Sequence, residues 1–277
     1  MSKLLAVVDG TIRESMAKFT FLAFVLMSTL ILLLLTFAVN LEVVDGALAT
    51  ARLFGQDIHL GSQQVSVDEL VIWTQKGLAG FLFGVGLFLS IFATANLVPV
   101  MVEKGYVDLL LSKPLSRTAL FLGRYLGALS VVGINLFYLI TGVWLILGLK
   151  TGVWRTGILW GGGVILVMYG IFLGFMMLVG VLTRSSSITI MLSYILFPLT
   201  LFLSVRKGLT VMLTSRLLVW LVEALYWILP KISEVGLLTT SLASGTPIAS
   251  LMPLLTSMLF GAGCLALATV TFVRKDY

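Results

Sequence analysis

Charged residues are scarce in this sequence of 277 residues. Only 11% of them are Asp, Glu, Lys or Arg, whereas a typical globular protein has about 25%. Hydrophobic residues make up 59% of the chain, and this composition excludes a soluble domain. Six tracts carry no charged residue at all: 19–41, 77–102, 125–149, 156–183, 185–205 and 235–273.

Each charge-free tract is long enough to cross a bilayer, because a spanning helix needs about 20 apolar residues. The tracts are continuously apolar and do not alternate with a period of two, so they favour helices over a barrel. We predict an all-α polytopic membrane protein with six transmembrane helices. The predicted spans are 19–41, 77–102, 118–149, 157–183, 188–205 and 249–273.

Cysteine and histidine occur once each, as Cys264 in an apolar tract and His59 in a polar stretch. One cysteine cannot form a disulfide within the chain, and one Cys with one His cannot build a typical zinc site. We therefore predict no metal site. The net charge of +6 does not indicate nucleic-acid binding, because the basic residues stand singly beside apolar tracts, where cations anchor helices to headgroups.

The charge-free tracts lack the carboxylates, histidines and lysines that proton-driven transporters and intramembrane hydrolases place inside the membrane. The chain also has no G-x-x-x-x-G-K-[ST] loop for ATP phosphates. We predict no catalytic residue and no cofactor in this chain, which is not an enzyme on this interpretation. Asn96 and Asn135 are polar groups within the spans, and they favour hydrogen bonds between helices over substrate binding.

The first residues predict an amphipathic helix over 2–17 that lies in the membrane interface. One side carries an apolar stripe, and the other carries two opposite-charge pairs spaced four residues apart. A short solvated extension is the alternative. The stripe is Leu4, Val8, Ile12 and Met16, and the pairs are Asp9–Arg13 and Glu14–Lys18.

Two longer polar stretches, 42–76 and 206–248, are predicted to be outer loops. Within the second, residues 208–229 are apolar except for Arg216 and Glu223, which fall on one helical face because they are seven residues apart. We interpret this segment as an interfacial helix. The competing interpretation is a seventh span with an intramembrane ion pair. The Ser- and Thr-rich residues after it are predicted to be loop.

Lys and Arg indicate the orientation. With a cytoplasmic N-terminus, ten of the 18 fall on inner segments and eight on outer ones, which is a small excess in the expected direction. All six tryptophans then fall near the outer side. We predict a multi-pass protein of the cell membrane (plasma or inner membrane) with both termini in the cytoplasm.

Glycines spaced four apart let helix backbones approach closely. Two such pairs lie within predicted spans, Gly80–Gly84 and Gly170–Gly174, and Gly123–Gly127 lies at the start of the third. We predict helix packing at these glycines, either within the chain or between two copies.

Residues 103–117 form the most distinctive stretch of the chain. It has a charged start at Glu103 and an apolar ridge of Val107, Leu110 and Leu111. A Lys-Pro break ends it, and Ser116 is a suitable N-cap for the next span. A short amphipathic helix between two spans is a handle that a soluble partner can grip, although the pattern also suits a plain connector.

This stretch resembles the cytoplasmic signature of ABC type-2 transporter permeases, the membrane subunits of ABC exporters, which read E-K-G-T-L-E-x-L-L-S-x-P-[VL]-S-R and then G-K. The residues that match are Glu103, Gly105, Leu110, Leu111, Ser112, Pro114, Ser116, Arg117 and Gly123. The departures are Tyr106, Val107, Asp108 and Arg124, which replace Thr, Leu, Glu and Lys. Weaker agreement extends to an F-x-R-[KR]-D ending at 272–276.

The resemblance implies a permease that couples ATP hydrolysis by a separate ATP-binding subunit to export of an unidentified substrate, or to force transmission across the membrane. ATP and magnesium would lie in that subunit, a second permease chain (identical or different) would complete the transporter, and membrane lipid would surround it. The coupling segment would contact the ATPase through Glu103, Gly105, Tyr106, Asp108, Leu110, Leu111, Lys113, Pro114 and Arg117. The alternatives are a non-transporting scaffold that anchors a soluble partner through 103–124 and, third, a membrane enzyme.

Overall fold

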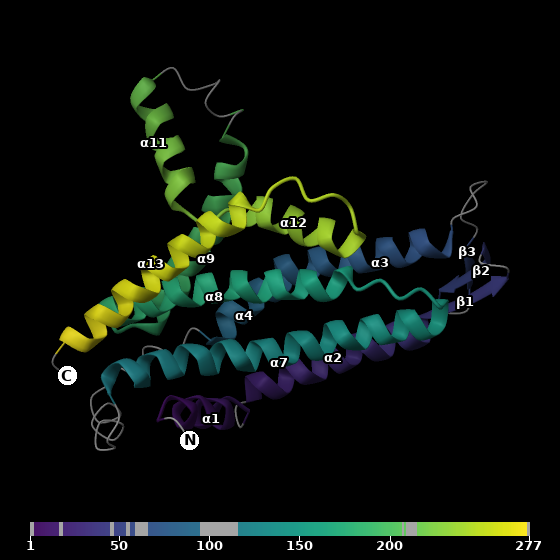
Figure 1. Ribbon diagram of the computed structural model, residues 1–277, viewed down its shortest axis with the longest axis horizontal. Helices are drawn as coiled ribbons and strands as arrows, with labels where there is room; N and C mark the ends of the chain where they lie inside the picture. The colour runs from purple at the N-terminus through teal and green to yellow at the C-terminus, as the bar shows by residue number, and fades with distance from the viewer. Residues whose placement is uncertain are drawn as a thin grey trace.

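The structure is a computed structural model. It describes residues 3–16, 19–44, 47–53, 56–58, 66–94, 116–206, 208 and 215–275. Long helices run along the longest axis of the molecule, and a small sheet lies at one end of them (Figure 1). Among the described residues, five helices are long and apolar enough to cross a membrane, or six if the bent pair at the N-terminus forms one span. The predicted all-α, polytopic membrane class is confirmed.

The elements follow one another in this order along the described chain. The first half contains α1 (Lys3–Met16), α2 (Phe19–Ala38), β1 (Val39–Val44), β2 (Ala47–Leu53), β3 (Gln56–Ile58), α3 (Val67–Phe81), the π-helical turn η1 (Leu82–Gly86) and α4 (Leu87–Thr94). The second half contains α7 (Arg117–Thr151), α8 (Gly157–Thr183), α9 (Ser186–Ser204), α11 (Arg216–Ile228), α12 (Ile232–Ser244) and α13 (Met252–Arg274).

Four predicted spans agree with helices of the structure to within a few residues, namely α7, α8, α9 and α13. The turn at residues 184–187 is also present, because α8 ends at Thr183 and α9 begins at Ser186. Pro198 lies inside α9, and the helix continues through it. The predicted first span begins at Phe19 as expected, and α2 ends at Ala38.

The second span begins ten residues before the predicted start at 77. The helix starts at Val67 and continues through η1 and α4 to Thr94, and the rest of the predicted span lies outside the described residues. The reason is a capping box: the Glu69 amide donates to Ser66 Oγ at 3.2 Å, and the Ser66 amide donates to the Glu69 carboxylate at 3.1 Å. Acidic residues suit the first turn of a helix, so the search for charge-free tracts missed this turn.

The predicted outer loop 42–76 also contains regular structure, which corrects the loop prediction. Strands β1, β2 and β3 form an antiparallel sheet in that order. The sheet extends from the end of α2 beside the end of α7 (Figure 1). Short connections between neighbouring strands are what antiparallel pairing requires.

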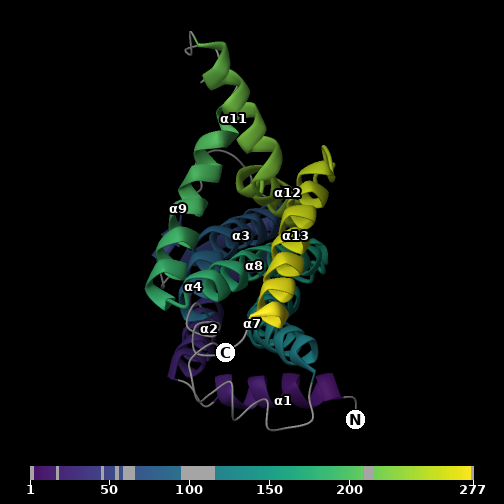
Figure 2. The same ribbon diagram turned by 90° about the vertical axis from the view of Figure 1, so that its left-hand side faces the viewer.

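The predicted outer helix in 208–229 is present as α11, which stands away from the other helices (Figures 1 and 2). Its 13 residues measure about 20 Å at 1.5 Å per residue, too short for the competing interpretation as a seventh span. The loop predicted to follow is wrong over most of its length, because α12 occupies Ile232–Ser244. Burial explains this helix: Val235 and Thr239 are fully buried where α12 packs on α3 and α8.

Helix α8 forms the centre of the bundle. In its most apolar stretch, 72% of the residues are buried, against 22% in α13. It packs against α7, α9, α12 and α13, and its buried side chains include Met168, Tyr169 and Phe172. Helices α7, α9, α12 and α13 are thereby arranged around α8 (Figure 2).

Candidate partner-binding end of the bundle

One end of the bundle gathers α1, the first turns of α7, and the last turns of α8 and α13 (Figures 1 and 2). We call it the junction end. The motif at 103–127 enters the bundle here, and the structure describes it from Ser116 onward. Eight of the nine predicted coupling residues lie outside the described residues: Glu103, Gly105, Tyr106, Asp108, Leu110, Leu111, Lys113 and Pro114.

Ser116 and Arg117 open α7 and attach it to the end of the chain. The Ala119 amide donates to Ser116 Oγ at 3.2 Å, which confirms the predicted N-cap. The Arg117 guanidinium donates to the carbonyl oxygens of Val273 and Lys275 at 3.2 and 2.8 Å. The last carbonyls of a helix have no partner within it and carry partial negative charge, so this arginine caps α13. The predicted contact of Arg117 with an ATPase stays a prediction.

A second cation ties the end of α13 to α8. The Lys275 ammonium donates to the carbonyl oxygen of Val181 at 2.8 Å. Beneath these contacts, the rings of Phe121 and Phe272 stack with centroids 5.0 Å apart, and both rings are fully buried. Two residues of the F-x-R-K ending noted in the sequence therefore bind the other helices, Phe272 to α7 and Lys275 to α8.

The glycine pair at the start of α7 receives α1. A Cβ atom added to Gly123 would lie 2.7 Å from Val7 Cβ, and one added to Gly127 would lie 2.5 Å from Thr11 Cβ. Real Cβ atoms do not approach that closely, so only glycine permits this distance between the helices. Since α1 is inclined at 69° to α2, it lies across the junction end instead of continuing the span.

An ion pair holds α1 in place on α7. The Arg124 guanidinium donates to the Glu14 carboxylate, and only 8% of the Arg124 side chain is exposed. The sequence pattern predicted that Glu14 pairs with Lys18, which lies outside the described residues. The pair of Glu14 with Lys18 stays a prediction. A search along one helix could not find Arg124, which is 110 positions away from Glu14. The predicted pair of Asp9 with Arg13 is confirmed at 3.0 Å.

The first turns of α7 therefore contact three other helices at once: α1 through its glycines and Arg124, α13 through Arg117, and both α8 and α13 through the buried ring of Phe121. A displacement of the chain just before Ser116 acts directly on this helix start. Packed helix ends move together because protein interiors have few voids to absorb strain. This geometry suits the transmission of a mechanical displacement.

The other predicted glycine contacts have different outcomes. A Cβ on Gly174 would lie 3.0 Å from the carbonyl oxygen of Gly261, so α8 and α13 approach closely there. Gly170 faces Tyr125, and Gly80 faces Thr240 at an ordinary 3.5 Å. Gly84 has no described neighbour within 4 Å. It lies in the π-helical turn, whose wider spacing removes it from the face of Gly80.

A polar cluster joins the end of α9 to α11 and α12. Arg206 lies over the Tyr226 ring at 3.2 Å and pairs with Glu223 at 3.3 Å and Glu234 at 3.9 Å. Glu223, which was predicted to share a helical face with Arg216, pairs with Arg206 from the preceding segment. The Tyr226 hydroxyl donates to Glu234.

Burial shifts two ionisable groups of this cluster. Burial, and then the hydrogen bond to the Glu234 carboxylate, raise the pKa of Tyr226 to about 12. Burial also lowers the pKa of Lys231, whose ammonium donates to Thr256 Oγ1 at 2.7 Å. Each charge here has a partner within the chain, so the cluster fixes α11 and α12 and does not present a free binding group.

The described residues contain no group of three His, Cys, Asp or Glu side chains that could hold a metal ion. The described residues do not otherwise test the predictions about catalysis, cofactors and partners.

Comparisons with known proteins add no relative. No protein-family model matches the chain, and no curated protein matches it. The arguments for function therefore rest on the sequence stretch at 103–127 and on the contacts of the junction end.

Proposed function

We propose that the chain is the membrane-spanning subunit of an ABC exporter, driven by a separate ATP-binding subunit that contacts residues 103–117. The observation that carries the proposal is the stretch 103–127, which resembles the permease signature. Its second half, from Ser116 to Gly127, supplies the capping, ion-pair and glycine contacts that join α7 to α1, α8 and α13.

The mechanism that we propose is a lever. Closure of the ATPase pair would displace residues 103–117, and the displacement would enter α7 at Ser116. Arg117 would carry it to the end of α13, and Arg124 with Gly123 and Gly127 would carry it to α1. The helices would then move together, and this movement would not require charged residues inside the bundle.

On this proposal the junction end faces the cytoplasm, and the sheet and α11 face the opposite side. The tryptophans support one consistent outer side. Trp73 lies near the start of α3, Trp144 near the end of α7, and Trp154 and Trp160 at the start of α8, all toward the sheet end of the bundle. Tryptophan is enriched at membrane interfaces.

The test is affinity purification of the tagged full-length chain from its native membranes in a mild detergent. We expect a protein with a Walker A motif to copurify, and its ATPase activity to change when the permease is present. Leu110→Asp combined with Leu111→Asp should abolish the copurification, because two carboxylates cannot enter an apolar cleft. The double variant Leu110→Ile, Leu111→Ile is the matched control and should retain the partner.

Unchanged copurification by the Asp variant would contradict docking at this segment. A soluble partner that copurifies but has no nucleotide-hydrolysing activity would favour the scaffold alternative. Labelling of residues 103–117 by a membrane-impermeant reagent applied outside the cell would refute the proposed orientation.

A further inference from the structure

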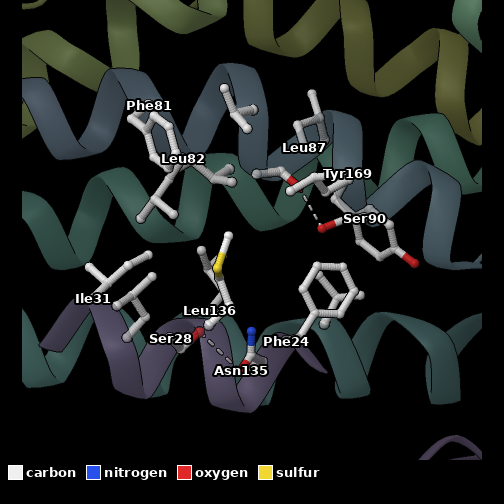
Figure 3. A pocket seen from close by; sticks show the side chains of 17 residues that line it. Phe24, Ser28, Ile31, Phe81, Leu82, Leu87, Ser90, Asn135, Leu136 and Tyr169 are labelled. Atoms are coloured by element: carbon white, nitrogen blue, oxygen red, sulfur yellow. Dashed lines mark hydrogen bonds between the residues drawn. The ribbon is translucent and has the colours of Figure 1, made fainter. Parts of the chain in front are cut away.

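A cavity of about 110 Å³ lies inside the bundle, between α2, the α3–η1–α4 segment, α7 and α8. Figure 3 shows Phe24, Ser28 and Ile31 of α2 on one side and Phe81, Leu82 and Leu87 on the other. The volume is several times the share of a single water molecule, about 30 Å³. Among the described residues that line the cavity, none is charged.

The cavity exists because α2 is attached mainly to α7. Ser28 donates to Asn135 Oδ1 at 3.3 Å, and the hydroxyls of Thr29 and Tyr138 lie 3.2 Å apart. Further along, a Cβ on Gly142 would touch Leu32. The packing of α2 against α3, η1 and α4 is much smaller, so a gap is left between them.

One polar group of the lining has unused hydrogen-bonding capacity and faces the cavity. It is not Tyr169, whose side chain is 1% exposed and whose hydroxyl is buried beside Thr94, out of reach of the cavity. The Asn135 amide accepts from Ser28 through its oxygen, and its nitrogen points toward the middle of the cavity (Figure 3). Polar groups inside a protein are unfavourable without a hydrogen-bond partner, so the unused nitrogen of Asn135 calls for an explanation.

The mouth of the cavity is apolar and faces outward from the bundle. Met27 on α2, and Phe81, Val85 and Leu89 on the opposite wall, are each between 40% and 54% exposed. In a protein whose long helices span a bilayer, such a surface contacts hydrocarbon chains. The wide π-helical turn η1 forms part of this wall, and π turns inside helices are frequent at functional sites.

We propose that this cavity binds the hydrocarbon chain of a membrane amphiphile that carries a neutral oxygen group, a hydroxyl or a carbonyl. The chain enters from the bilayer between α2 and the α3–η1–α4 segment. The apolar lining takes up the methylene groups, whereas Asn135 Nδ2 donates a hydrogen bond to the oxygen. A charged headgroup stays outside, because no side chain of the lining could compensate its charge.

The experiment is photolabelling of the full-length chain in its membranes with a hexadecanol that bears a mid-chain diazirine and an alkyne. We expect the labelled peptides to concentrate in residues 24–31 and 81–90. Unlabelled hexadecanol should compete more strongly than hexadecane, which lacks the oxygen. Asn135→Leu should weaken competition by hexadecanol about threefold to tenfold, the value of one hydrogen bond inside a membrane protein, and should leave competition by hexadecane unaffected.

Matched controls separate the cavity from the general lipid surface. Tyr194→Phe removes a hydroxyl from α9, and Leu267→Trp enlarges an exposed side chain of α13. Neither residue lines the cavity, and neither variant should change the labelling. Val85→Trp fills the mouth and should remove most of the label from residues 81–90. Size-exclusion chromatography confirms that each variant is folded.

Two results would overturn the inference. Labelling could spread evenly over α9 and α13, or hexadecane could compete as well as hexadecanol. Because the labelling needs neither ATP nor an ATPase, its failure would leave the proposed exporter function standing, and the reverse also holds.

Discussion

Helices α8 and α2 are both long and apolar, yet they occupy opposite positions in the molecule. Helix α8 contains seven glycines and α2 contains none. Helix α8 is the buried centre, whereas most large side chains of α2 are half exposed. Hydropathy therefore does not decide which span lies inside. Small residues do, because they let neighbouring backbones approach.

The close approach of α8 to α13 gives the largest expected effect. A Cβ on Gly261 would lie 2.9 Å from the Cα atom of Ile171, and backbone cannot rotate away. Gly261→Ala should lower the free energy of unfolding in mixed detergent micelles by about 1–3 kcal/mol, the cost of overpacking. Gly263→Ala, on the same helix with open space around it, is the control and should be neutral or slightly stabilising. Equal losses in both variants would contradict the packing argument.

The next effect concerns the attachment of α1. Arg124→Met should lower the free energy of unfolding by about 1–3 kcal/mol, because it removes the charge-assisted hydrogen bond that joins α7 to α1; the cost falls toward the lower figure since Glu14 is itself a third exposed. Adding Glu14→Gln to Arg124→Met should recover part of the loss. Thermal unfolding in detergent of Arg124→Met, Glu14→Gln and the double variant would measure this recovery. A double variant as unstable as the sum of the two single variants would show that the pair is not coupled.

The contact between α2 and α7 should tolerate an added methyl group, whereas the contact between α8 and α13 should not. A Cβ on Gly142 would lie 2.7 Å from the end of the Leu32 side chain, which can change rotamer. Gly142→Ala should therefore change the free energy of unfolding by less than about 1 kcal/mol. A loss as large as that of Gly261→Ala would erase the difference between the two helices.

The smallest expected effect is at the hydroxyl contact between α2 and α7. Thr29→Val removes the 3.2 Å contact with Tyr138 and should cost about 0.6 kcal/mol, the average for such bonds in membrane proteins. Thr271→Val on α13 is the control, because its hydroxyl bonds only within its own helix. The comparison uses the unfolding midpoint in the same micelles, and a larger loss in the control would contradict the predicted order.

Much of the fold could be predicted from the pattern of charge-free tracts, because each span had to be apolar over its whole length. The search for charge-free tracts failed where charged residues lie inside a helix. Asp68 and Glu69 lie in the first turn of α3, where Asp68 binds Arg155 at 2.6 Å and Glu69 completes the capping box. It failed again at α12, whose Ser and Thr residues suggest a loop.

The hydroxyls of α12 bond to its own backbone, as Thr239 does to the carbonyl of Val235 at 2.8 Å. Only the packing of this helix on α3 and α8 makes it regular. The predicted role of Asn135 between helices is confirmed by its hydrogen bond with Ser28, although the cavity beside it has no signal in the sequence.

The sequence by itself determined that this chain crosses a membrane as helices, where most spans begin and end, and which cap opens α7. Those features depend on local composition, since a segment in hydrocarbon must be apolar and must satisfy its own backbone. The tertiary structure decided that Glu14 pairs with Arg124, that Gly123 and Gly127 receive α1, and that a cavity remains beside α2. These depend on contacts between residues far apart in the chain, which no local pattern encodes.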